Sequence, residues 1–123
     1  MEINKITELI LEAAFKVHSK LGPGLLESAY KACLAYELKK MGLKVDVEKS
    51  LPLVYDDLTL DCGYRIDILV ENQVIVELKA VDALIEVHVA QGLTYLKLSG
   101  NKVGLLLNFN TKSLRDGIRR LAM

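Results

Sequence analysis

The chain has 123 residues, of which 51% are hydrophobic and 26% are charged. This composition is typical of a soluble globular protein, and the length suffices for a core without disulfides, so we expect one domain over residues 1–123. The 16 basic and 16 acidic residues balance, which argues against tight, non-specific binding of duplex nucleic acid. No apolar run approaches the ~20 residues of a membrane span, and the N-terminus lacks a signal-peptide pattern. We therefore expect a cytoplasmic protein without a membrane partner.

Hydrophobic spacing predicts two helices at the start of the chain. Apolar residues recur every three or four positions from Asn4 to Leu21, which is the pattern of an amphipathic helix. Gly22-Pro23-Gly24 ends this helix. A second helix is expected to begin there, with Pro23 near its first turn, and to run to about Met41, where Gly42 is a natural stop.

Three strand candidates follow the two helices. The first is Val45–Val54, interrupted or ended near Pro52, and after a turn the second is Thr59–Val70. The third is Val74–Val81. The remaining predicted elements are a helix over Leu84–Leu98, a strand covered on both faces over Val103–Phe109, and a short closing helix over Leu114–Leu121.

The order of these elements predicts an α/β fold. Three consecutive strands favour an antiparallel meander, and the strand–helix–strand passage favours a crossover to a parallel neighbour. We therefore expect a mixed β-sheet, made of a three-strand antiparallel meander plus a crossover strand, with helices on both faces.

Charged residues interrupt two apolar runs that flank Glu71-Asn72-Gln73. The runs read as a β-hairpin. If its turn has three residues centred on Asn72, then residues whose numbers sum to 144 face each other. Asp67 then lies across from Glu77, with Lys79 two residues along on the same face. Two opposed carboxylates repel each other unless a cation lies between them, so this pairing predicts a metal site.

The hairpin also has a plainer interpretation. A two-residue turn would shift the pairing by one position and leave an ordinary edge hairpin with solvated charges. Glu77 and Lys79 share a face in either register, so Lys79 could simply form a salt bridge there. If a metal does bind, the all-oxygen ligands favour Mg²⁺ or Mn²⁺ over zinc or copper.

The helices carry further candidate residues, each with a structural alternative. Glu27 and Tyr30 are three residues apart and share a helix face, although they could equally be a surface glutamate and a core-edge tyrosine. Gln91 could face a site or satisfy a buried backbone group. Further candidates for substrate binding or support are Tyr95 on the face of Gln91, and His18 and His88, which could titrate near neutral pH.

The plan of elements, with Asp67 followed by Glu77-Leu78-Lys79 on the next strand, resembles the PD-(D/E)XK nuclease superfamily, or restriction-endonuclease-like fold. More narrowly, Gly24-Leu25-Leu26-Glu27-Ser28-Ala29-Tyr30 fits the pattern that names the GxxExxY protein family. Other segments similar to that family are Val17-His18, Leu21-Gly22-Pro23-Gly24, His88-Val89-Ala90-Gln91, Thr94-Tyr95-Leu96 and Leu107-Asn108-Phe109-Asn110. One departure is Ile66, which precedes Asp67 where the superfamily motif has proline.

The resemblance implies a divalent-metal nuclease site. Asp67 and Glu77 would be metal ligands, with the Leu78 main-chain carbonyl as a third. Lys79 would position the attacking water or stabilise charge on the phosphate, and Glu27 would be an additional ligand or hold a metal-bound water. Gln91 and Tyr95 fit a Q-x-x-x-Y pattern that helps to hold nucleic acid in some branches of the superfamily.

The expected function is therefore that of a Mg²⁺- or Mn²⁺-dependent nuclease acting on DNA or RNA. One alternative is a non-catalytic nucleic-acid-binding or assembly module that keeps the fold. Another is a phosphohydrolase that acts on a small molecule with the same carboxylates. We also expect a homodimer, because a chain of this size cannot surround a duplex alone and superfamily members often act as dimers.

Overall fold

A computed structural model describes all residues from Met1 to Met123. The helices are α1 (Ile3–Leu21), α2 (Glu27–Lys40) and α3 (Glu86–Ser99), with one 3₁₀ turn, η1 (Leu114–Gly117). The strands are β1 (Val45–Ser50), β2 (Leu53–Tyr55), β3 (Leu58–Leu60), β4 (Arg65–Val70), β5 (Val74–Lys79), β6 (Val103–Asn108) and β7 (Ile118–Ala122). None of the helices is long and apolar enough to cross a lipid bilayer.

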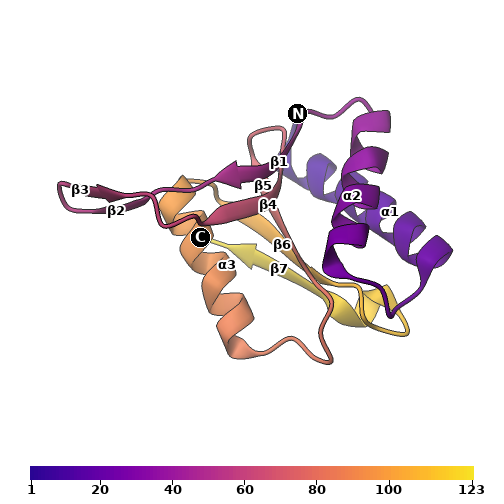
Figure 1. The fold of residues 1–123 in the computed structure, drawn as a ribbon. Helices are drawn as coiled ribbons and strands as arrows, with labels where there is room; N and C mark the ends of the chain where they lie inside the picture. The colour runs from indigo at the N-terminus through magenta and orange to yellow at the C-terminus, as the bar shows by residue number, and fades with distance from the viewer.

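A five-stranded sheet in the order β1-β4-β5-β6-β7 forms the centre of the fold. Strands β1, β4 and β5 are antiparallel neighbours, and β5 pairs in parallel with β6 after the α3 crossover. Helices α1 and α2 cover one face of the sheet and α3 covers the other (Figure 1). The mixed sheet with helices on both faces, predicted from the order of elements, is confirmed.

The two faces of the sheet support two hydrophobic cores. The larger core joins α1 and α2 to the sheet, and the smaller one joins α3 to it. Strand β6 lies between the two cores and is buried along its whole length, which explains its nearly continuous apolar sequence. In α1, the residues with three- and four-residue spacing are the ones that face the core, including Ile6, Ile10 and Val17.

The predicted closing helix over Leu114–Leu121 is wrong. Only one 3₁₀ turn forms there, and β7 follows it as an antiparallel neighbour of β6. This pairing satisfies backbone groups along β6 that a helix would leave without partners. Gly117 permits the approach, because a Cβ at that residue would lie 2.3 Å from the Asn108 carbonyl oxygen.

Two other boundaries differ from the prediction. Helix α2 begins at Glu27, so Pro23 lies in the connecting loop and not in the first turn. The predicted strand Thr59–Val70 is divided into β3 and β4, with residues 61–64 between them. Strands β2 and β3 consequently form a separate two-stranded hairpin that extends from the body of the protein (Figure 1).

Candidate active site

The β4–β5 hairpin has the register that a three-residue turn predicts. Ile68 pairs with Val76, and Val70 pairs with Val74, so the numbers sum to 144. The backbone ladder ends at Ile68–Val76, and the next pair in register is Asp67 with Glu77. The predicted pairing is therefore confirmed up to the position where these two carboxylates meet.

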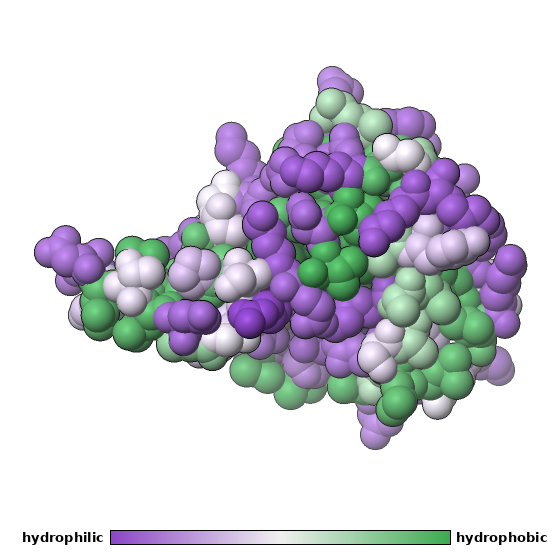
Figure 2. Space-filling model, turned by 45° about the horizontal axis from the view of Figure 1, so that its top comes forward, coloured by the Kyte–Doolittle hydropathy of each residue, from purple (hydrophilic) through white to green (hydrophobic).

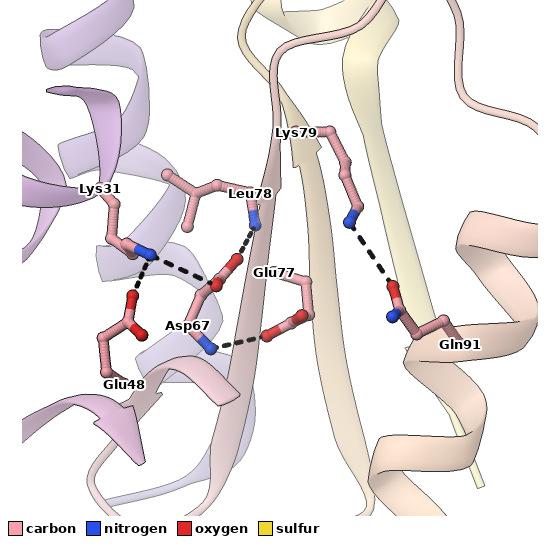
Figure 3. A network of polar contacts seen from close by, with 7 residues as sticks. All are labelled: Lys31, Glu48, Asp67, Glu77, Leu78, Lys79 and Gln91. Atoms are coloured by element: carbon pink, nitrogen blue, oxygen red, sulfur yellow. Dashed lines mark hydrogen bonds and ion pairs between the residues drawn. The ribbon is translucent and has the colours of Figure 1, made fainter. Parts of the chain in front are cut away.

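At that position the carboxylates replace the backbone ladder. Glu77 Oε2 accepts a hydrogen bond of 2.8 Å from the Asp67 backbone N–H. Asp67 Oδ2 accepts one of 2.9 Å from the backbone N–H of Leu78 (Figure 3). A backbone N–H of each strand thus binds the carboxylate of the other strand, and these two hydrogen bonds fix both side chains.

A change of side-chain orientation within β4 explains why Asp67 points toward β5. Ile66 belongs to the α3 core, whereas Ile68 belongs to the core under α1 and α2. In a regular strand these two residues would face the same side, so the chain reorients at Asp67. The β1–β4 register skips the same position, because Glu48 in β1 has a φ of 57° and no paired residue.

Glu77 is a buried acid with a strongly perturbed pKa. Only 6% of the residue is exposed. Burial is the main cause that raises its pKa to about 8, and the charge of Asp67 adds to it, while the Asp67 N–H and Lys79 act in the opposite direction. Glu77 therefore holds a proton at neutral pH unless a cation offsets its charge.

Lys31 and Glu48 form a part of the site that the sequence analysis missed. Lys31 Nζ lies 3.6 Å from Asp67 Oδ1 and also donates to Glu48 (Figure 3). The hydrogen bond to Glu48 is the main cause that raises the Lys31 pKa. Lys31 follows Glu27 by four residues on α2, so helix spacing could have identified it as a neighbour of the predicted acid.

Glu27 lies in the electrostatic field of the same carboxylates. Its pKa is raised first by burial and then by the charge of Asp67, while Lys79 and Lys31 lower it. The loop before it is held from both sides. The Tyr30 hydroxyl donates to the Gly22 carbonyl at 2.6 Å, and Asn110 Oδ1 accepts from the Gly24 N–H at 3.1 Å. The first turn of α2 is therefore anchored beside the carboxylate pair.

Lys79, at the end of β5, faces α3. Its Nζ lies 3.5 Å from Gln91 Oε1 (Figure 3). Gln91 thus contacts the predicted lysine and not a buried backbone group. Tyr95, one turn further along α3, is buried, and its pKa is raised by burial first and then by the charges of Glu77 and Asp67. Gln91 and Tyr95 therefore lie on the side of α3 that faces the carboxylates.

The end of β5 is held by its neighbour β6. The Phe109 N–H donates to the Lys79 carbonyl at 2.9 Å. The buried Asn108 side chain accepts from the Val81 N–H at 3.1 Å and donates to the Val81 carbonyl at 3.0 Å. These bonds position the backbone from which Lys79 projects, which is a role that the sequence analysis did not assign to Asn108.

Three further residues predicted for the site, His18, Tyr30 and His88, form their contacts away from the carboxylate pair. His18 Nε2 bonds to the Thr111 carbonyl at 2.8 Å. The Tyr30 ring is fully buried and stacks on Phe109, with centroids 4.8 Å apart. His88 Nδ1 accepts from the Ile85 N–H at 3.1 Å and so caps α3. Their hydrogen bonds stabilise the frame around the site.

The acids supply ligands that suit a hard divalent cation, although they are not gathered into a three-acid cluster. No group of three or more His, Cys, Asp or Glu side chains is arranged to hold a metal ion. Asp67 and Glu77 nevertheless provide carboxylate oxygens, and Glu77 is buried where its negative charge is costly. The chemistry of this donor set fits Mg²⁺ or Mn²⁺.

Comparison with known proteins gives one match. The family model described as PD-(D/E)XK nuclease superfamily matches residues 4–121, which is almost the whole chain. No curated protein and no solved structure matches it. The matched region contains every residue of the site described above.

Proposed function

The chain belongs to the PD-(D/E)XK nuclease superfamily, and we propose that it hydrolyses phosphodiester bonds in DNA or RNA with Mg²⁺ or Mn²⁺ bound at Asp67 and Glu77. The reciprocal hydrogen bonds of these two acids carry the proposal. They fix two carboxylates side by side at a break in the sheet, where a cation would relieve their mutual repulsion.

The metal ligands in this proposal are the Asp67 and Glu77 carboxylates and the Leu78 main-chain carbonyl. Glu27 is a further ligand or holds a metal-bound water. When bound, the cation makes a coordinated water more acidic and offsets negative charge on the phosphate. The protein contributes by holding the two acids through the backbone N–H groups of Asp67 and Leu78, before any cation or substrate arrives.

Lys79 and Lys31 have different roles in the proposed reaction. Lys79 lies on the α3 side, where Gln91 holds its ammonium group, so Lys79 stabilises the charge that develops on the phosphate or orients the attacking water. Lys31 lies on the other side and contacts Asp67 Oδ1. Lys31 therefore offsets the charge of Asp67 while no cation is bound, and Lys31 is itself paired with Glu48. Gln91 and Tyr95 support the nucleic-acid strand beside Lys79.

The motif of the narrower GxxExxY family gains a physical interpretation here, and we propose membership of that family on this basis. Gly24 has a φ of +99°, which favours glycine, and its N–H bonds to Asn110. Glu27 is the first residue of α2. The Tyr30 hydroxyl bridges the Gly22 carbonyl and the Leu25 N–H. The glycine and tyrosine thus hold the turn that presents the glutamate.

The test is a cleavage assay on single- and double-stranded DNA and RNA, with Mg²⁺, Mn²⁺ or EDTA. Wild type should cleave at least one substrate only with added metal, and Glu77→Ala or Lys79→Ala should abolish cleavage. Lys97→Ala, at an exposed position of α3, is the matched control and should cleave as wild type does. Equal cleavage by wild type and Glu77→Ala would identify a contaminating nuclease and refute the proposal.

A non-catalytic binding module is the second candidate. The lack of a three-acid cluster favours it, and so does the neutral net charge. This candidate predicts that metal and oligonucleotide bind while no substrate is cleaved. Gel-shift and cleavage assays on the same oligonucleotides distinguish the two functions, because only the nuclease would shorten the labelled strand.

A further inference from the structure

The β2–β3 hairpin, residues Leu53–Leu60, forms an arm with one apolar face. Leu53 pairs with Leu60, and Tyr55 pairs with Leu58, so these four side chains share a face. Tyr55 is 69% exposed and Leu58 is 52% exposed. Figure 2 shows the arm extending from the body with hydrophobic residues along it and a hydrophilic tip. The apolar face of the arm has no cover within the chain.

An arm of this kind needs a partner surface. A two-stranded hairpin is marginally stable in water without packing against another element. Contiguous exposed apolar residues on a small protein are typical of a surface that binds another molecule. The position of the arm, away from α1, α2 and α3 (Figure 1), leaves the partner to come from outside the chain.

The charge of the arm distinguishes a protein partner from nucleic acid. Residues 51–64 contain Asp56, Asp57 and Asp61 and no lysine or arginine. This segment therefore has a formal charge of −3, and the rest of the chain, with 16 basic and 13 acidic residues, has +3. An acidic arm is repelled by phosphates, whereas a second copy of this chain carries an excess of positive charge outside its own arm.

A groove on the opposite edge of the sheet has the matching chemistry. It lies between the start of α3 and β7, has a volume of about 560 Å³, and is lined by Leu84, Ile85, Glu86, Val89, Ala90, Leu93 and Arg119. Arg119 is the one basic residue of this lining. Its guanidinium makes no hydrogen bond or ion pair within the chain. The groove thus offers apolar walls, one unpaired cation at Arg119 and one carboxylate at Glu86.

We propose that two copies of this chain exchange their arms, each seating its apolar face in the groove of the other. The acidic tip at Asp56 and Asp57 would then meet Arg119 of the second copy. The arm follows β1 and the groove borders β7, so they belong to opposite edges of the sheet and do not compete within one copy. Each copy therefore presents a free arm and a free groove, and two copies related by a two-fold axis would exchange their arms reciprocally. This interface is independent of the proposed nuclease activity.

Sedimentation equilibrium of the full chain tests this proposal. Wild type should be a dimer at micromolar concentration, and Tyr55→Thr with Leu58→Thr should weaken the dimer at least tenfold while keeping β-forming residues in the arm. Val54→Thr, on the other face of the arm, is the matched control and should leave the dissociation constant unchanged. Far-UV circular dichroism identifies any variant that fails to fold.

Charge-reversal substitutions on the arm and in the groove test which surface receives the arm. Asp56→Lys with Asp57→Lys, and separately Arg119→Glu, should each weaken the dimer about tenfold, and a mixture of the two folded proteins should restore hetero-association. A monomeric wild type at 100 µM overturns the proposal. So does a dimer unaffected by the arm variants, or arm variants that remain dimeric and lose only oligonucleotide binding. Restoration in the mixture supports the exchange, and failure of the mixture to associate refutes the Arg119 contact.

Discussion

Asp67 and Glu77 each hold the position of the other, because each carboxylate accepts a hydrogen bond from a backbone N–H of the opposite strand. These two hydrogen bonds use Glu77 Oε2 and Asp67 Oδ2, so the second carboxylate oxygen of each residue takes no part in them. On Asp67 that oxygen faces Lys31. Burial of Glu77 makes ionisation of its carboxyl group unfavourable and so raises its pKa. The pair is therefore rigid, and its charge state should respond to pH and to divalent cations.

Metal-free protein should lose stability as the pH rises from about 4.5 to about 8. The folded-state pKa of Glu77 is raised to about 8 from 4.5, so the folded state binds more protons than the unfolded state in this window and the free energy of unfolding falls with pH. The full loss is on the order of 5 kcal/mol. Urea unfolding in EDTA at several pH values measures it, and Glu77→Gln should have a flatter profile. Equal slopes for both proteins would contradict the assignment.

Mg²⁺ or Mn²⁺ should raise the melting temperature, and more strongly at pH 8 than at pH 6. Protons compete with the cation for Glu77, and a ligand that binds only the folded state stabilises it with the logarithm of its concentration once that exceeds the dissociation constant. Thermal unfolding against metal concentration measures the effect. Asp67→Asn should remove most of the shift. The same shift in Asp67→Asn as in wild type would show that the cation binds elsewhere.

Removing the charge of Lys31 should tighten metal binding. Its ammonium group lies 3.6 Å from Asp67 Oδ1 and repels a cation at that oxygen. Lys31→Met should therefore bind Mn²⁺ severalfold more tightly than wild type in calorimetric titration. Lys97→Met, a matched exposed lysine on α3, should not change the affinity. Weaker binding by Lys31→Met would mean that the lysine assembles the site and does not compete with the metal.

Tyr30→Phe should lower the free energy of unfolding by about 1–3 kcal/mol, because it leaves the Gly22 carbonyl and the Leu25 N–H without their shared partner. Cleavage should also slow, since this hydroxyl holds the loop before Glu27. Denaturant unfolding and the cleavage rate measure the two effects. Tyr36→Phe, at an exposed position on the same helix, is the control. Unchanged stability in Tyr30→Phe would rule out the bridge.

The sequence predicted the parts of the fold that local patterns determine. The helical spacing in α1 follows from its single buried face. The odd number of residues in the β4–β5 turn set the register that brings Asp67 opposite Glu77. The apolar run of β6 indicated burial on both faces. These signals lie within one element or between two adjacent ones.

The features that were missed depend on contacts between distant segments. Ile118 and Leu121 have helical spacing, yet β7 forms because β6 offers an unpaired edge and Gly117 fits against Asn108. The φ of 57° at Glu48 is rare for a residue with a side chain. No local pattern indicated that break in β1, so the contact of Glu48 with Lys31 could not be predicted.

Cleavage of an end-labelled oligonucleotide against Mn²⁺ concentration, by wild type and Asp67→Asn purified in parallel, tests the central claim most directly. The proposed site predicts that the wild-type rate rises to a plateau as the metal saturates, and that Asp67→Asn remains inactive at every concentration while retaining a folded spectrum. Matching curves for the two proteins would contradict the claim that Asp67 and Glu77 form a metal-dependent nuclease site.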